Sequence, residues 1–324
     1  MSTKRFASLI QIIVLTLGAV VAIAQPMRSY PSRQLLGGVK ENLQISFLDF
    51  IFPNRRERTR GSRRPARDPF NNALPQIITP RNTALIRTNA LTLQWQPVAG
   101  ATSYTVEING PGVDWEVEVT GTEAIYNELD SLTPNYRYII IVTADNGISS
   151  KLAEQVGFQL LPETERERVN AQVDAIKAEQ LGTDEEALAI ALAYFEFEHS
   201  DPDWKSTALN QAAINVLETR IQAGTQDSRV YLLQADTYLR IGLPLLAQER
   251  YEEALTYAQA AGQPELQAES HWGLGDVAQG ETAYGDAIEH LQAAQTLYRD
   301  LGELEQVEEL QTRIERLSRE IPSS

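Results

Sequence analysis

The sequence predicts a multidomain chain of class β + α, in which a β-sandwich is followed by an array of paired helices. Three observations support this prediction. Apolar residues alternate with polar ones at a period of two through residues 75–161. From Pro162 onward, the apolar residues follow helical spacing instead. Within that helical part, a set of small and large residues recurs after 40 residues, which is typical of stacked helix pairs.

Residues 1–24 have the pattern of an export signal. Lys4 and Arg5 precede an apolar stretch, and small residues at Ala22 and Ala24 suit the narrow pocket of a signal peptidase. We expect cleavage after Ala24 and a location in the periplasm or cell envelope of a bacterium. The alternative is an uncleaved N-terminal helix that anchors the chain, because the apolar stretch is 19 residues long and could just span a bilayer.

The composition of residues 25–74 predicts a basic, largely disordered linker. The first 70 residues hold 12 basic and 4 acidic side chains, whereas the remainder holds 16 basic and 40 acidic ones. The arginine-rich part has no apolar periodicity, so burial cannot offset the entropy lost on ordering. It could bind an anionic envelope surface, or it could be a solvated linker only. Its arginines are Arg55, Arg56, Arg58, Arg60, Arg63, Arg64 and Arg67.

The alternating pattern of residues 75–161 indicates several short strands. Leu91, Leu93 and Trp95 alternate with polar residues, and clusters of glycine, asparagine and proline separate this run from the later ones. The run Tyr138–Val142 is apolar at every position, which predicts a central strand with another surface against its outer side.

This region resembles a fibronectin type III domain. In that family, a tyrosine six positions after a leucine forms a tyrosine corner, in which its hydroxyl binds the backbone of a cross-over loop. Tyr138 stands at that distance from Leu132. The resemblance implies a sandwich fold but no particular activity. It rests on Trp95, Gly100–Val106, Leu132, Thr133, Pro134, Tyr138, Val142, Ala144, Asn146 and Gly147.

Residues 162–324 predict a domain of helical repeats. Small residues at matching positions let two antiparallel helices approach closely, while a large residue fills the space beside them. The recurring set is Tyr231, Ala235, Ala247, Tyr251 and Ala254, which returns as His271, Gly275, Ala287, Leu291 and Ala294. With the pair Leu274-Gly275, this set resembles tetratricopeptide repeats. We expect about three repeats and a polar capping helix at 303–318. The alternative is an unrelated helical bundle.

Composition restricts the chemistry. The chain lacks cysteine, so disulfides, thiolate nucleophiles and cysteine-ligated zinc are excluded. The only histidines, His199, His271 and His290, do not follow the spacing of a zinc motif. A net charge of −16 disfavours nucleic acid, because phosphate contacts need a basic surface. We therefore predict no catalytic residue, no cofactor, no metal site and no nucleic-acid partner.

The resemblance to tetratricopeptide repeats implies a concave groove that binds a peptide or a partner subunit. Trp272 would then be an exposed aromatic anchor, and the alternative is a small helix rotation that buries Trp272 and exposes His271. We expect a non-catalytic interaction or scaffold protein of the cell envelope. The alternative is an envelope-anchoring protein that binds glycan or anionic lipid through the sandwich and the arginine-rich segment. The expected groove residues are Leu232, Asp236, Arg240, Trp272 and Asp276.

Overall fold

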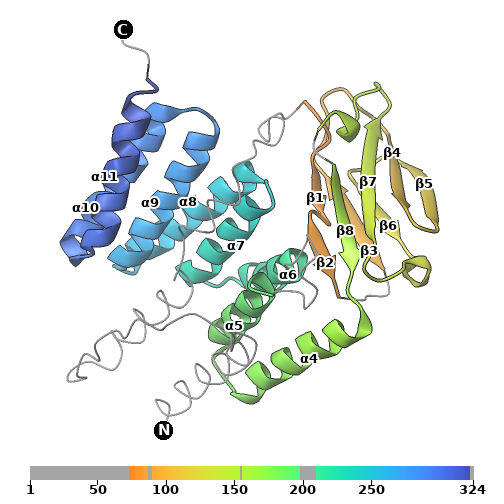
Figure 1. Cartoon of the computed structure of the whole chain (residues 1–324), viewed down its shortest axis with the longest axis horizontal. Coiled ribbons are helices and arrows are strands. Elements are labelled where there is room, and N and C mark those ends of the chain that lie inside the picture. Colours follow the sequence, from red (N-terminus) through yellow and green to blue (C-terminus); the bar gives the residue numbers. More distant parts are fainter. Residues whose placement is uncertain (1–72, 87–89, 154, 198–208, 322–324) are drawn as a thin grey trace, which may run out of the picture.

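The computed structural model of the chain describes residues 73–86, 90–153, 155–197 and 209–321. In this part, a β-sheet region over residues 77–160 precedes eight helices, so the predicted order of a β part and an α part is confirmed. The β-sheets lie at one end of the molecule and the C-terminal helices at the other (Figure 1). The predicted export signal and the seven arginines of the predicted linker lie outside the described residues.

Eight strands form two sheets that share one core. The smaller sheet has the order β1-β3-β6, and the larger has the order β2-β8-β7-β4-β5, in which only the β2–β8 pair is parallel. The strands are β1 (Ile77–Thr79), β2 (Thr83–Leu85), β3 (Leu91–Trp95), β4 (Tyr104–Gly110), β5 (Val113–Val119), β6 (Glu123–Tyr126), β7 (Arg137–Ala144) and β8 (Val156–Leu160), with short 3-10 turns η1 (Leu129–Ser131) and η2 (Ser150–Leu152).

The alternation predicted for the strands is observed. In β3, Leu91, Leu93 and Trp95 are buried and the residues between them are exposed. Trp95 packs edge-on against Tyr104 of the other sheet, with ring centroids 5.5 Å apart, so side chains from both sheets fill the space between them. Strand β7 is central, as predicted, but its outward side chains, including Ile139, are only half-buried.

The hydroxyl of Tyr138 binds the backbone of the segment that precedes β7. The Thr133 N–H donates a hydrogen bond to Tyr138 Oη, with an N···O distance of 2.7 Å. The tyrosine ring is fully buried and stacks against Phe158, with centroids 5.6 Å apart. The contact that the leucine-to-tyrosine spacing predicts is therefore present.

Replacing Tyr138 by phenylalanine should lower the free energy of unfolding by about 1 kcal/mol, because the Thr133 N–H then loses its acceptor. Urea unfolding of the full chain, followed by circular dichroism, measures the change. Tyr136→Phe is the matched control, since Tyr136 is 51% exposed, and it should leave stability unchanged. Equal stability of the two variants would contradict a structural role for the Tyr138 hydroxyl.

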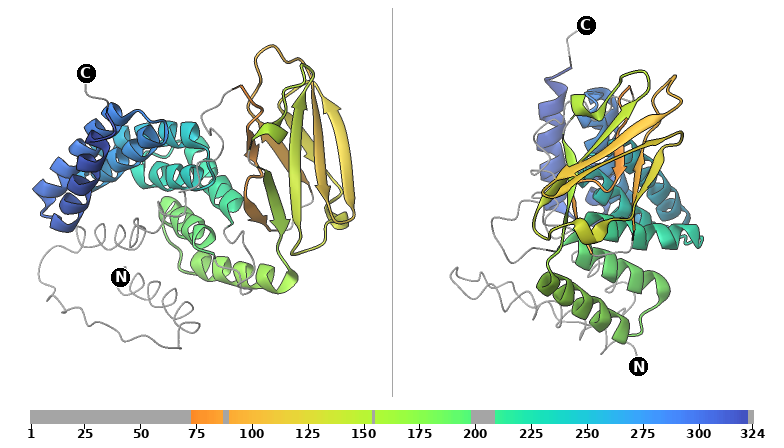
Figure 2. Two further views of the ribbon diagram at one scale, coloured as in Figure 1. Left: turned by 45° about the horizontal axis from the view of Figure 1, so that its top comes forward. Right: turned by 90° about the vertical axis from the view of Figure 1, so that its right-hand side faces the viewer.

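The helices pack in chain order, each against the next, and form a curved row (Figure 2). None of them, within the described part of the chain, is long and apolar enough to cross a membrane. They are α4 (Glu163–Ala178), α5 (Thr183–Phe195), α6 (Asn210–Gln222), α7 (Ser228–Arg240), α8 (Pro244–Ala260), α9 (Pro264–Gly280), α10 (Tyr284–Leu301) and α11 (Leu304–Ser318).

The turns before and after α8 share the same sequence pattern and backbone conformation. Gly242 and Gly262 adopt φ angles of 77° and 63°, which favour glycine, and each stands two residues before a proline. Those prolines, Pro244 and Pro264, begin the next helix, where a missing N–H removes no helical hydrogen bond. The turn at Gly242 joins the two helices of one pair, and the turn at Gly262 separates that pair from the next.

Small residues allow the helices to approach closely. The alanines of the recurring set are fully buried. A Cβ atom on Gly275 would lie 2.7 Å from the Leu291 side chain, and one on Gly273 would lie 2.3 Å from the Tyr251 ring. Both glycines of α9 therefore serve helix packing. Helix pairs that pack in this way are present, as the sequence pattern predicts.

Candidate interaction surface

An arginine in the turn between β1 and β2 joins the sheets to the helices. Arg81 is only 7% exposed, and its Nε atom donates a hydrogen bond of 2.6 Å to the carbonyl oxygen of Ile241. Its Nη1 atom donates to the carbonyl oxygen of Ile77 at 3.2 Å. Ile241 follows the last turn of α7, where free carbonyls carry partial negative charge. The guanidinium therefore stabilises the end of α7.

Neighbouring residues extend this junction. The side chain of Asn210 donates to the carbonyl oxygen of Asn82 at 3.1 Å, and the Gln211 N–H donates to Thr83 Oγ1 at 3.2 Å. The second bond satisfies an amide in the first turn of α6. An apolar cluster beside these bonds combines residues from both parts, namely Ala84 and Leu161 with Val169, Phe197 and Leu209.

Sequence analysis missed Arg81. The residue is separated by 160 positions from its acceptor, Ile241, and no motif spacing connects the two. The residues that flank Arg81 in the sequence also have no composition that would indicate a site. The junction is therefore visible only in the folded chain, where hydrogen bonds and apolar contacts join the sheets to the helices.

The expected groove anchor is buried. Trp272 is 5% exposed and packs edge-on against Tyr298 of α10, with ring centroids 6.0 Å apart. Both belong to an apolar cluster that includes Leu310 and Ile314 of α11. Leu232 is buried as well.

The prediction of an exposed Trp272 is wrong. Gly275 faces Leu291 as predicted and His271 is half-buried, so α9 is not rotated. Trp272 is buried because α10 and α11 contribute to the same core.

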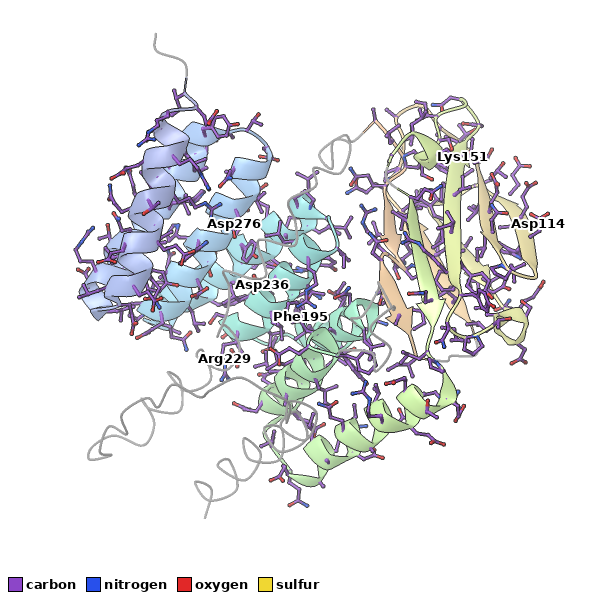
Figure 3. The ribbon with its side chains drawn as sticks, in the orientation of Figure 1. Asp114, Lys151, Phe195, Arg229, Asp236 and Asp276 are labelled. Carbon is purple, nitrogen blue, oxygen red and sulfur yellow. The ribbon has the colours of Figure 1, made fainter. Side chains whose placement is uncertain are left out.

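The two expected groove aspartates make internal contacts. Asp236 Oδ1 accepts a hydrogen bond of 2.5 Å from the hydroxyl of Tyr251 on α8. Asp276, its counterpart in the next helix pair, forms an ion pair with Arg313 of α11. Position 291, which corresponds to Tyr251, is a leucine without a hydroxyl, so the second aspartate has a different partner. Figure 3 labels both aspartates within the row of helices.

Arg240 also makes an internal contact. Its guanidinium carbon lies 3.0 Å from the centroid of the Phe195 ring, and its Nη1 atom donates to the carbonyl oxygen of the same residue. Such a contact links the end of α7 to the end of α5. Of the five expected groove residues, Trp272 and Leu232 are therefore buried in the core, whereas Arg240 is exposed and the two aspartates are half-buried.

Carboxylates gather on the outer face of the larger sheet. Asp114, Glu116 and Glu118 are exposed on the edge strand β5. Glu116 stands opposite Glu107 of β4, and Lys151 forms an ion pair with Glu107 at 3.0 Å. Asp114 and Lys151 are labelled in Figure 3. This face carries more negative than positive side chains, so it does not favour contact with an anionic lipid surface.

The described part of the chain contains no group of three or more histidine, aspartate or glutamate side chains arranged to hold a metal ion. No protein-family model matches the chain, and no curated protein sequence matches it.

Proposed function

We propose that the protein is a non-catalytic scaffold of the bacterial cell envelope that binds a peptide or a partner subunit. The observation that carries this proposal is the buried junction around Arg81, which connects the sheets to the helical array through polar contacts. Two parts joined by such contacts suit a protein that positions partners relative to each other. Export through residues 1–24 is part of the proposal.

The proposal takes the β part as a fibronectin type III-like domain and the helices as tetratricopeptide-like repeats. The first assignment is supported by the hydrogen bond between the Thr133 N–H and the Tyr138 hydroxyl. The second is supported by the close approach at Gly275 and Leu291 and by the packing of each helix against the next. Both kinds of domain commonly present binding surfaces, and neither implies a reaction.

Trp272 and Leu232 are buried, so a partner must contact other side chains in their place. Large apolar side chains that remain exposed occur on both parts of the chain, including Ile125 on β6 and Leu304 at the start of α11. Exposed apolar side chains are suitable positions at which to probe for a partner. Anchoring to anionic lipid through the sandwich is not favoured, because the outer face of its larger sheet is acidic.

Photo-cross-linking in intact cells tests the proposal. A photoreactive amino acid at Ile125, Leu152 or Leu304 of the full chain should yield an adduct of one defined mass from at least one position. Gln259, exposed on α8, is the control position and should yield none of that adduct. The substitution Arg81→Ala should reduce the adduct, because it loosens the junction. Adducts with the chain itself only, from every position, would contradict a scaffold role.

A further inference from the structure

Two of the three histidines meet between neighbouring helices. His271 lies on α9 and His290 lies on α10, and their Nδ1 atoms are 3.2 Å apart, so one ring donates a hydrogen bond to the other. The ring centroids are 5.5 Å apart and the ring planes are inclined by 38°. Both residues are half-buried, so the pair remains accessible to small solutes. Packing of α9 against α10 creates this contact across 19 positions of sequence.

The separation of the two nitrogens suits a shared metal ion. A divalent transition metal binds imidazole nitrogen at about 2.0–2.1 Å. Two such nitrogens then lie about 2.9 Å apart when the angle at the metal is near 90°, and about 3.4 Å apart at the tetrahedral angle. The observed 3.2 Å lies between these values. A metal ion between the rings would replace the proton that the two nitrogens share, and both rings would turn to direct their lone pairs to the ion.

We propose that His271 and His290 form a binding site for a divalent transition metal ion of the copper, nickel or zinc type. These ions favour imidazole ligands, whereas magnesium and calcium favour oxygen. The two Nδ1 atoms supply the protein ligands, and water completes the coordination shell. An ion bound by both histidines cross-links α9 to α10 and so stabilises the packing of these two helices. Because both histidines are half-buried, the ion can exchange with solvent. This site is independent of the proposed scaffold function.

Isothermal titration of the untagged full chain with Cu²⁺ tests the site, with glycine in the buffer to compete for weakly bound copper. The wild-type chain should bind one Cu²⁺ through these residues at pH 7.5. His271→Gln and His290→Gln should each weaken that binding about tenfold or more. His199→Gln is the matched control, because it removes the remaining histidine of the chain and should leave the affinity unchanged.

Equal affinity in the wild-type chain and in both glutamine variants would overturn the site, and so would the absence of binding at about 1 mM Cu²⁺. If either variant loses its helical circular dichroism signal, the electron paramagnetic resonance spectrum of the Cu²⁺-bound wild-type chain decides whether both histidines bind the ion. Splitting from two imidazole nitrogens is expected. Splitting from fewer than two nitrogens, or loss of the signal in His199→Gln, would refute the assignment.

Discussion

Replacing Trp272 by alanine should lower the free energy of unfolding by about 3–5 kcal/mol, the usual cost of removing a large buried aromatic side chain. Trp272 packs against Tyr298 and shares a cluster with Leu310 and Ile314, so its removal leaves a cavity between α9, α10 and α11. Urea unfolding of the full chain, monitored by circular dichroism, measures the loss. The effect concerns folding, whereas an exposed anchor would affect partner binding alone.

Two further variants sharpen this test. Trp272→Phe keeps an apolar ring and should cost clearly less than alanine. Leu304→Ala removes an apolar side chain that is 66% exposed on α11, and it should change stability by less than about 0.5 kcal/mol. A loss below about 1 kcal/mol for Trp272→Ala would contradict its place in the core.

Replacing Arg81 by alanine should cost about 3 kcal/mol, because a buried charged donor is lost and the Ile241 carbonyl loses its partner. Thermal and urea unfolding measure the loss of stability. Hydrogen exchange should also increase in β2 and at the start of α6, where Thr83 and Asn210 depend on the same junction. The increase at both sites would show that the arginine holds the sheets and the helices together.

Controls separate the buried junction from general effects of charge. Arg137→Ala removes an exposed arginine that donates to the Gln155 carbonyl at 2.8 Å, and it should change stability by less than about 1 kcal/mol. Arg81→Lys retains the charge but not the planar fork that reaches both Ile241 and Ile77, so an intermediate loss is expected. Equal stability of Arg81→Ala and Arg137→Ala would contradict the role of the junction.

Local sequence patterns predicted the elements well, for physical reasons that act along the chain. Alternation in the segment Leu91–Trp95 indicated a strand with one buried face, and the structure shows that pattern of burial. The recurrence that includes Gly275 and Leu291 indicated helix pairs in close contact, and those two residues do meet. Such patterns are informative because the periods of a strand and a helix determine which side chains share a face.

Which helix faces remain exposed was not predictable in the same way. Trp272 and Leu232 were expected on the open side of their helices, yet both are buried. One residue corresponds to a rotation of about 100° around a helix, and the packing of later helices decides which face is covered. The ion pair between Asp276 and Arg313 depends likewise on where α11 packs. Helical spacing alone was therefore wrong about the exposure of Trp272 and Leu232, although Arg240 is exposed as expected.

By itself, the sequence determined the class of the chain, the approximate extent of its strands and helices, and the absence of cysteine chemistry. Those properties follow from composition and from periodicity over a few residues. Only the tertiary structure brought Arg81 to Ile241 and His271 to His290. Each of these contacts joins residues from different elements, and their separation in sequence has no fixed relation to their distance in space. They form because burial of shared apolar surface brings the elements together, and polar groups enclosed there must find partners.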